Sequence, residues 1–126
     1  MSSIPTTAIV HPVRRFGGTL EVPGDKSISH RLAMLAGAAS GNSVIRNFLR
    51  CEDCLNTVRA MAALGARSFF DGDGALHIQG MHGKFLEPAG PLDLGNSGTG
   101  LRLLTGLIAG QPISVELTGD ESLCSR

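Results

Sequence analysis

Apolar residues recur at helical spacing in three parts of the chain and alternate with polar residues in the shorter parts between them. This pattern predicts helices over about 25–39, 52–64 and 95–109, with a further helix beginning near Ser122. It predicts strands at 19–22, 43–49, 67–70, 75–79 and 113–117, and a Gly- and Pro-rich connection over 80–91. Strands and helices in this order indicate a layered α/β (α+β) fold.

The first two predicted helices are amphipathic. In the helix from 25, Ser27 and Arg31 lie one helical step apart on a polar face that is left free for a ligand. The opposing apolar stripe consists of Ile28, Leu32, Leu35, Ala36 and Ala39. In the helix from 52, the residues expected to face the core are Leu55, Val58, Met61 and Ala62.

A glycine turn leads directly into the first of these helices, with the sequence Pro23-Gly24-Asp25-Lys26-Ser27-Ile28-Ser29-His30-Arg31. The backbone N–H groups of a first helical turn lack intrahelical partners, and the helix dipole adds partial positive charge there. With Lys26 and Arg31 close by, the turn is a candidate anion site. The alternative is that Asp25 is only an N-cap and the charged residues are solvated surface.

The same pattern returns at a constant offset of 71 residues, because Gly95 to Leu103 matches Gly24 to Leu32 in its glycine, Asx cap, arginine and leucine, which makes Asn96 the expected cap. The second copy replaces the lysine region with small residues, Ser97, Gly98 and Gly100, which let a ligand approach the backbone. Two such helix starts in one cleft would hold two anionic groups. In the alternative interpretation, the glycines serve only for packing.

Composition limits the size of the domain and the classes of partner that the chain is expected to bind. The chain has 126 residues, enough for one modest domain, and its eleven basic residues balance eleven acidic ones. Trp and Tyr are absent and only five Phe occur, so nucleic acid is an unfavourable partner. No apolar run is long enough for a membrane span, and we expect a soluble cytoplasmic protein. The three cysteines, including the pair Cys51 and Cys54, are expected to be free structural thiols rather than a zinc or redox site.

Three segments carry a resemblance to a known family: Gly-Asp-Lys-Ser-Ile-Ser-His-Arg at 24–31, Gly-Asn-Ser-Gly-Thr-Gly-Leu-Arg at 95–102, and Leu-Thr-Gly-Asp-Glu-Ser-Leu-Cys-Ser-Arg at 117–126. They resemble the amino-terminal part of the 5-enolpyruvylshikimate-3-phosphate (EPSP) synthase family, over less than a third of its length. The related UDP-N-acetylglucosamine enolpyruvyl transferases differ, since they carry Lys-Asn where Lys26-Ser27 stands here.

The resemblance implies an enolpyruvyl transferase fold of two domains, each made of three βαβαββ repeats. Residues 1–23 would belong to the lower domain, with a hinge near Pro23-Gly24, and residues 24–126 would begin the upper domain. The second copy of the repeat is incomplete, so we expect a fragment truncated at Arg126; a naturally small domain with a short tail is the alternative.

The implied reaction transfers the enolpyruvyl group of phosphoenolpyruvate to the 5-hydroxyl of shikimate 3-phosphate, a step of the shikimate pathway of aromatic amino-acid biosynthesis. No metal or cofactor is implied. The family's general acid and base lie later in its sequence, so the fragment is expected to be inactive alone and to need the remainder of the enzyme, a monomer at full length. The alternatives are a noncatalytic module that binds a phosphate ligand, or a relative of the same fold such as an RNA 3'-phosphate cyclase.

The resemblance also assigns roles to single residues. Lys26 would be catalytic and touch both substrates, while Ser27 and Arg31 would bind shikimate 3-phosphate. The phosphoenolpyruvate pocket, for which glyphosate competes in this family, would be lined by Lys26, Asn96, Gly98, Thr99 and Arg126. Arg102 matches a motif arginine near the site, without a defined role.

Overall fold

The computed structural model describes residues 7–126. Its helices are α1 (Lys26–Ala38), α2 (Glu52–Ala63), α3 (Gly98–Ile108) and the single turn α4 (Glu121–Cys124). Its strands are β1 (Asn42–Ile45), β2 (Arg67–Phe70), β3 (Leu76–Gln79), β4 (Leu92–Asp93) and β5 (Leu117–Thr118). The α/β character predicted from the sequence is confirmed, and among the described residues no helix is long and apolar enough to cross a membrane.

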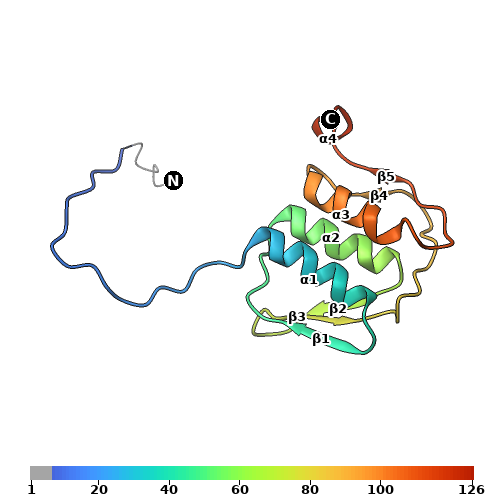
Figure 1. The fold of residues 1–126 in the computed structure, drawn as a ribbon, viewed down its shortest axis with the longest axis horizontal. Coiled ribbons are helices and arrows are strands. Elements are labelled where there is room, and N and C mark those ends of the chain that lie inside the picture. The colour runs from blue at the N-terminus through green and yellow to red at the C-terminus, as the bar shows by residue number, and fades with distance from the viewer. Residues whose placement is uncertain (1–6) are drawn as a thin grey trace.

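Strands β1, β3 and β2 form an antiparallel sheet in that order. Helices α1 and α2 lie on one face of this sheet, and α3 packs onto both of them (Figure 1). The core between these layers is continuous; its largest fully buried apolar side chains are Met61, Leu64, Leu76, Ile78, Leu94 and Leu104. The three long helices run in the same direction, so their N-termini lie at one end of the molecule (Figure 1).

The β2–β3 hairpin agrees closely with the sequence prediction. Asp71 closes its turn, because one carboxylate oxygen accepts hydrogen bonds from the backbone N–H of Asp73 at 3.0 Å and of Ala75 at 2.9 Å. Gly74 has a φ of 81°, a conformation that favours glycine. The tight turn therefore fixes the register in which Phe69 faces His77.

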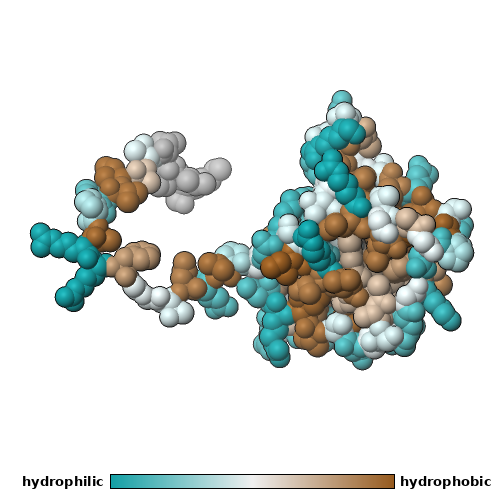
Figure 2. Space-filling view, in the orientation of Figure 1, coloured by the Kyte–Doolittle hydropathy of each residue, from teal (hydrophilic) through white to brown (hydrophobic). Residues whose placement is uncertain are grey.

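The predicted orientation of α1 is wrong. Of the predicted apolar stripe only Ala36 is buried, whereas Ile28, Leu32 and Leu35 are 57%, 40% and 63% exposed and Ala39 is exposed. The buried positions of α1 are Ser29, His30, Ala33, Met34, Ala36 and Gly37. Small residues allow α1 to approach α2 closely: a Cβ added at Gly37 would lie 2.5 Å from Met61 Cε. Close packing through small residues therefore decides the orientation, and apolar surface remains exposed over α1 (Figure 2). In α2, Val58 and Met61 are buried as predicted, whereas Leu55 is half-buried and Ala62 is exposed.

The structure also shortens or removes three predicted strands. Residues 19–22 form no strand, and Leu20 is 83% exposed, since no described strand lies beside them to supply backbone partners. The strand predicted over 43–49 ends at Ile45, because Asn47 turns the chain with a φ of 54°. The strand predicted over 113–117 is reduced to β5, which pairs in parallel with β4, a strand that sequence analysis did not predict.

Candidate functional site

The N-terminus of α1 carries the first candidate group. Asp25 is the N-cap, and its carboxylate accepts a hydrogen bond from the Ile28 N–H at 2.7 Å. The ammonium of Lys26 forms an ion pair with Asp53, and the hydrogen bond to this carboxylate is the main reason why the pKa of Lys26 is raised. Lys26 therefore presents a full positive charge beside the free backbone donors of the first turn.

Arg31 lies along the same end of α1. Its Nη1 donates a hydrogen bond to the Ser27 carbonyl oxygen at 3.0 Å, so the guanidinium folds back over the first turn, and both residues are exposed. Lys26, Ser27 and Arg31 are thus brought together, as the sequence spacing predicts. We call this group the α1 cluster.

The N-terminus of α2 adjoins the α1 cluster. It carries Glu52 and Asp53 in its first turn, where acidic residues complement the helix dipole, and Asp53 is the partner of Lys26. The Cys54 Sγ donates a hydrogen bond to the Lys26 carbonyl oxygen at 3.6 Å. Burial raises the pKa of Cys54 to about 12, so it remains a thiol, and all three cysteines are free as predicted.

At the N-terminus of α3 the N-cap lies one position later in the repeat than it does in the first copy. The 71-residue offset equates Asn96 with the cap Asp25, but the N-cap here is Ser97, whose Oγ accepts from the Gly100 N–H at 3.0 Å. The expectation that Asn96 caps this helix is therefore wrong. The Asn96 side chain instead donates to Asp120 at 2.7 Å and accepts from Arg126 Nη2 at 2.6 Å.

Arg126 is oriented toward Gly98. Its Nη2 also donates to Ser122 Oγ at 3.1 Å, and the two bonds from this nitrogen restrain the guanidinium. A Cβ added at Gly98 would lie 3.2 Å from Arg126 Nη1 and 4.0 Å from Arg102 Nη1. Two guanidinium groups therefore border the first residue of α3, and we call Asn96, Gly98, Arg102 and Arg126 the α3 cluster.

His30 connects the two clusters. It is fully buried; its Nδ1 lies 2.7 Å from Thr57 Oγ1 on α2, and its Nε2 lies 3.5 Å from Ser97 Oγ at the start of α3. Burial is the main cause of its lowered pKa, and the nearby positive charge of Lys26 acts in the same direction. The first turns of α1 and α3 are consequently adjacent, and a neutral imidazole lies between them.

Comparison with known proteins identifies the family to which this arrangement belongs. The sequence model of the EPSP synthase family, described as 3-phosphoshikimate 1-carboxyvinyltransferase, matches residues 10–126. The chain belongs to the EPSP synthase family. The 3-phosphoshikimate 1-carboxyvinyltransferase of Methylococcus capsulatus is 50% identical over 117 residues, which are 91% of this chain and 26% of the relative. That of Hyphomonas neptunium is 48% identical over 117 residues, covering 92% of this chain and 27% of the relative.

The solved structures agree with the sequence relatives. EPSP synthase from Acinetobacter baumannii superposes with a TM-score of 0.78 at 41% identity, over 86% of this chain and 25% of that protein. The family resemblance and the fold class predicted from the sequence are therefore confirmed. The chain spans about a quarter of the length of the EPSP synthases that it matches.

Within this EPSP synthase family chain, the predicted site residues fall into the two clusters, with Thr99 exposed in the first turn of α3. Sequence analysis missed His30, Asp53, Thr57 and Asp120 as parts of the site. One signal was present for His30: it lies four residues after Lys26 and so one helical step from it. Asp53 and Thr57 are also four residues apart on α2, but their contacts with Lys26 and His30 on α1 depend on tertiary packing.

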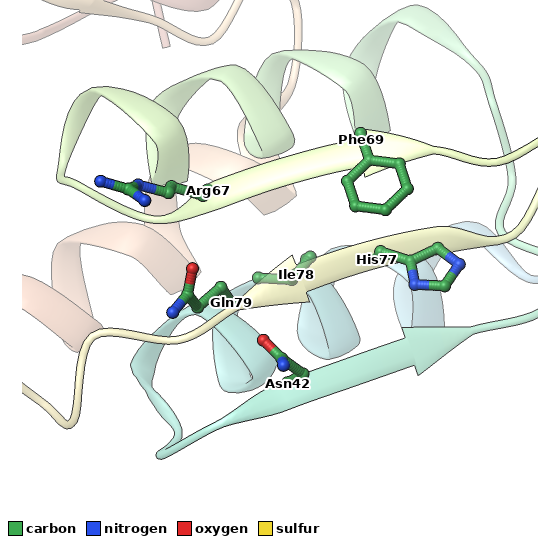
Figure 3. Close-up of a pocket in the computed structure, with 6 residues that line it drawn as sticks. All are labelled: Asn42, Arg67, Phe69, His77, Ile78 and Gln79. Carbon is green, nitrogen blue, oxygen red and sulfur yellow. The ribbon is translucent and has the colours of Figure 1, made fainter.

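A separate hollow lies on the outer face of the sheet. It encloses about 370 Å³ and is lined by Asn42, Arg67, Phe69, His77, Ile78 and Gln79 (Figure 3). The Phe69 and His77 rings stack with their centroids 4.7 Å apart, and His77 Nε2 lies 2.7 Å from an Asp71 carboxylate oxygen. The Asp71 contact occupies His77 Nε2, and the stacked rings form an apolar wall of the hollow. The hollow lies on the strands and is separate from the two clusters at the helix starts.

Proposed function

We propose that this chain supplies part of the substrate site of a 3-phosphoshikimate 1-carboxyvinyltransferase. The reaction transfers the enolpyruvyl group of phosphoenolpyruvate to the 5-hydroxyl of shikimate 3-phosphate and releases phosphate. The observation that carries the proposal is the pairing of two cationic helix starts, the α1 cluster and the α3 cluster, through His30. Each substrate carries a phosphate and a carboxylate, so a double anion site suits the reaction.

The proposal includes roles for single residues, which their contacts support. Ser27, Arg31 and Lys26 would bind shikimate 3-phosphate, because the exposed guanidinium and the ammonium face solvent at one helix start. Asn96, Gly98, Thr99 and Arg126 would bind phosphoenolpyruvate, with Lys26 contacting both substrates as the catalytic lysine. Asn96 already holds Arg126 at 2.6 Å, which lowers the entropic cost of orienting the guanidinium toward a ligand.

The remainder of the enzyme would supply the general acid that protonates the vinyl carbon and the general base that removes the hydroxyl proton. The described residues contain no cluster of three or more His, Cys, Asp and Glu residues suited to hold a metal ion. Our proposal assigns to this chain binding and orientation by cationic side chains. It predicts no turnover by the chain alone, because the acid and the base would come from the remainder of the enzyme.

The domain assignment is part of the same proposal. Residues 1–23 would join the lower domain and Pro23-Gly24 would be the hinge. Phe16, Leu20 and Val22 are exposed apolar residues, and the proposal gives them a contact surface in the lower domain of the full-length enzyme. A Cβ added at Gly24 would lie 2.0 Å from the Asn47 carbonyl oxygen. Only glycine therefore lets the backbone at position 24 lie this close to Asn47. A monomeric full-length enzyme in the cytoplasm stays a prediction.

The relatives reported above are named 3-phosphoshikimate 1-carboxyvinyltransferase, which favours the transferase over a noncatalytic binding module or an RNA 3'-phosphate cyclase. A chimera tests this choice directly. This chain replaces the matched segment of the Methylococcus capsulatus enzyme, and phosphate release is measured with both substrates present. We expect turnover by the chimera; a folded chimera without turnover would favour the binding module.

The same chimera tests the site residues. Lys26→Met and Arg31→Ala are each expected to reduce kcat/KM by about tenfold to a hundredfold, since each removes a charge-assisted contact to a substrate anion. Arg67→Ala is the matched control, because Arg67 is also an exposed arginine but lies on β2, away from both clusters. Normal rates in the Lys26 and Arg31 variants would contradict the assignment of the α1 cluster.

A further inference from the structure

The contacts of His30 have a definite direction. Thr57 Oγ1 donates to the Asp53 carbonyl oxygen at 3.4 Å, so its lone pairs are left to accept the Nδ1–H of His30 at 2.7 Å. Ser97 Oγ accepts from the Gly100 N–H, so its hydroxyl proton is available to the unprotonated Nε2. Both contacts are satisfied together by the neutral imidazole with its proton on Nδ1.

The surroundings favour this neutral form. The charged groups that act on the ring are Lys26 and Arg31 on its own helix and Asp53 on α2. The two cations oppose protonation, and complete burial removes the water that would solvate an imidazolium. The carboxylate of Asp53 acts in the opposite direction, but it is already paired with Lys26. His30 therefore behaves as a fixed polar connector among three helices.

The start of α3 rests directly on this connector. A Cβ added at Gly100 would lie 2.8 Å from Ser97 Oγ and 3.1 Å from Thr57 Oγ1, so the helix backbone passes against both hydroxyl groups. Ser97 immediately precedes Gly98, the residue bordered by Arg126 and Arg102. A change in the contact between His30 and Ser97 must therefore move the backbone that forms the α3 cluster.

We propose that His30 is a positioning residue, which acts through Ser97 to place the Gly98–Gly100 backbone relative to the α1 cluster. It touches no substrate, and its effect falls on the anion held at α3. For the identity of that anion, phosphoenolpyruvate, the inference rests on the proposed function. The placement of the α3 backbone by His30 rests only on the contacts of the buried His30, Thr57 and Ser97 side chains.

The first experiment uses the 126-residue chain and needs no ligand. In His30→Asn the amide nitrogen replaces Nδ1 and keeps the contact with Thr57, while the contact with Ser97 is lost. We expect the backbone amide NMR signals of Gly98, Thr99 and Gly100 to shift in His30→Asn. Ser29→Ala is the matched control: it removes another buried hydrogen bond of α1, the 3.0 Å contact from the Leu49 N–H, which lies away from α3.

The side chain of His30 provides a second readout in the same samples. Its ring nitrogen signals should report the neutral form with the proton on Nδ1 from pH 8 to about pH 6, below the usual histidine pKa of about 6.5. A ring that titrates normally, or that carries its proton on Nε2, would overturn the proposal. So would equal shifts of the α3 amides in His30→Asn and Ser29→Ala.

The chimera then measures the effect on the reaction. We expect His30→Asn and Ser97→Ala each to raise the KM for phosphoenolpyruvate about fivefold and to leave the KM for shikimate 3-phosphate within about twofold. Because His30 acts through Ser97, the double variant should be no worse than the more affected single variant. Additive effects, or equal changes in both KM values, would refute the positioning role. A chimera without turnover would refute the proposed function, while the NMR measurements would still decide the geometric inference.

Discussion

Gly98→Ala is expected to separate the binding of glyphosate from that of phosphoenolpyruvate. The added Cβ would lie 3.2 Å from Arg126 Nη1, a contact tight by a few tenths of an ångström. Arg126 is exposed, so its guanidinium can shift toward solvent, and its 2.6 Å bond to Asn96 is distorted. Alanine gains up to about 1 kcal/mol over glycine in a helix, which offsets the distortion, so the free energy of unfolding should change by less than about 0.5 kcal/mol.

Ligand binding should respond more strongly than stability. A hydrogen bond to a charged group contributes about 1.5–3 kcal/mol, and loss of half of it corresponds to a loss of affinity of roughly fourfold to tenfold. Glyphosate is longer than phosphoenolpyruvate, so the added methyl should raise its inhibition constant by about the upper end of this range, tenfold, and the KM for phosphoenolpyruvate only about twofold to threefold.

The assay is phosphate release by the chimera at varied phosphoenolpyruvate and glyphosate concentrations. Gly106→Ala is the control, because it makes the same change in the same helix, where an added Cβ meets nothing within 4 Å. It should raise the free energy of unfolding by about 0.5–1 kcal/mol and leave both ligands unaffected. Equal losses of affinity for glyphosate and phosphoenolpyruvate in Gly98→Ala would refute the placement of Gly98 in this pocket.

Two further predictions concern stability. Gly24→Ala should lower the free energy of unfolding by about 2–3 kcal/mol, and Tm by about 10 °C, because the 2.0 Å approach to the Asn47 carbonyl oxygen forces the backbone to move. Gly72→Ala, with open space around it, should leave Tm nearly unchanged, and equal Tm values for the two variants would contradict the close passage at Gly24. The lowered pKa of His30 means that the unfolded chain binds this proton more readily, so stability is complete above about pH 6.5 and decreases as the pH falls below it. Thermal unfolding from pH 8 to pH 5 should show a smaller loss in His30→Asn than in the exposed-histidine control His82→Asn, and parallel curves would contradict the buried neutral ring.

Local patterns predicted the elements whose structure is determined locally. The hairpin at Asp71 and the helix start at Asp25 follow from turn and capping chemistry, which acts within a few residues. The helix start at Glu52 has no side-chain cap and follows from the acidic residues that complement the helix dipole. The strand at 19–22 was wrong because alternation shows only that a segment suits a sheet, while a strand forms only beside a partner. The short β4 has no pattern of its own, because two residues are too few to alternate, and of the strand predicted over 113–117 only the end pairs with it, as β5.

The two clusters show the same division between local and tertiary effects. Lys26, Ser27 and Arg31 were predicted together because one helical turn brings them together. The orientation of α1 was wrong, because Gly37 and its small neighbours pack more closely than Ile28 and Leu35 can. The role of His30 depends on Thr57 and Ser97, which lie 27 and 67 residues away, and helical spacing cannot reveal that contact.

The one-residue shift of the N-cap in the second copy has a consequence for how repeated units diverge. In the first copy the Asx side chain of Asp25 is consumed by capping, whereas in the second copy Ser97 takes over that task. Asn96 is thereby released to orient Arg126, which lies 30 residues further along the chain. When the next residue in a repeated unit takes over helix capping, the side chain at the Asx position can make a different contact without any change of its place in the repeat.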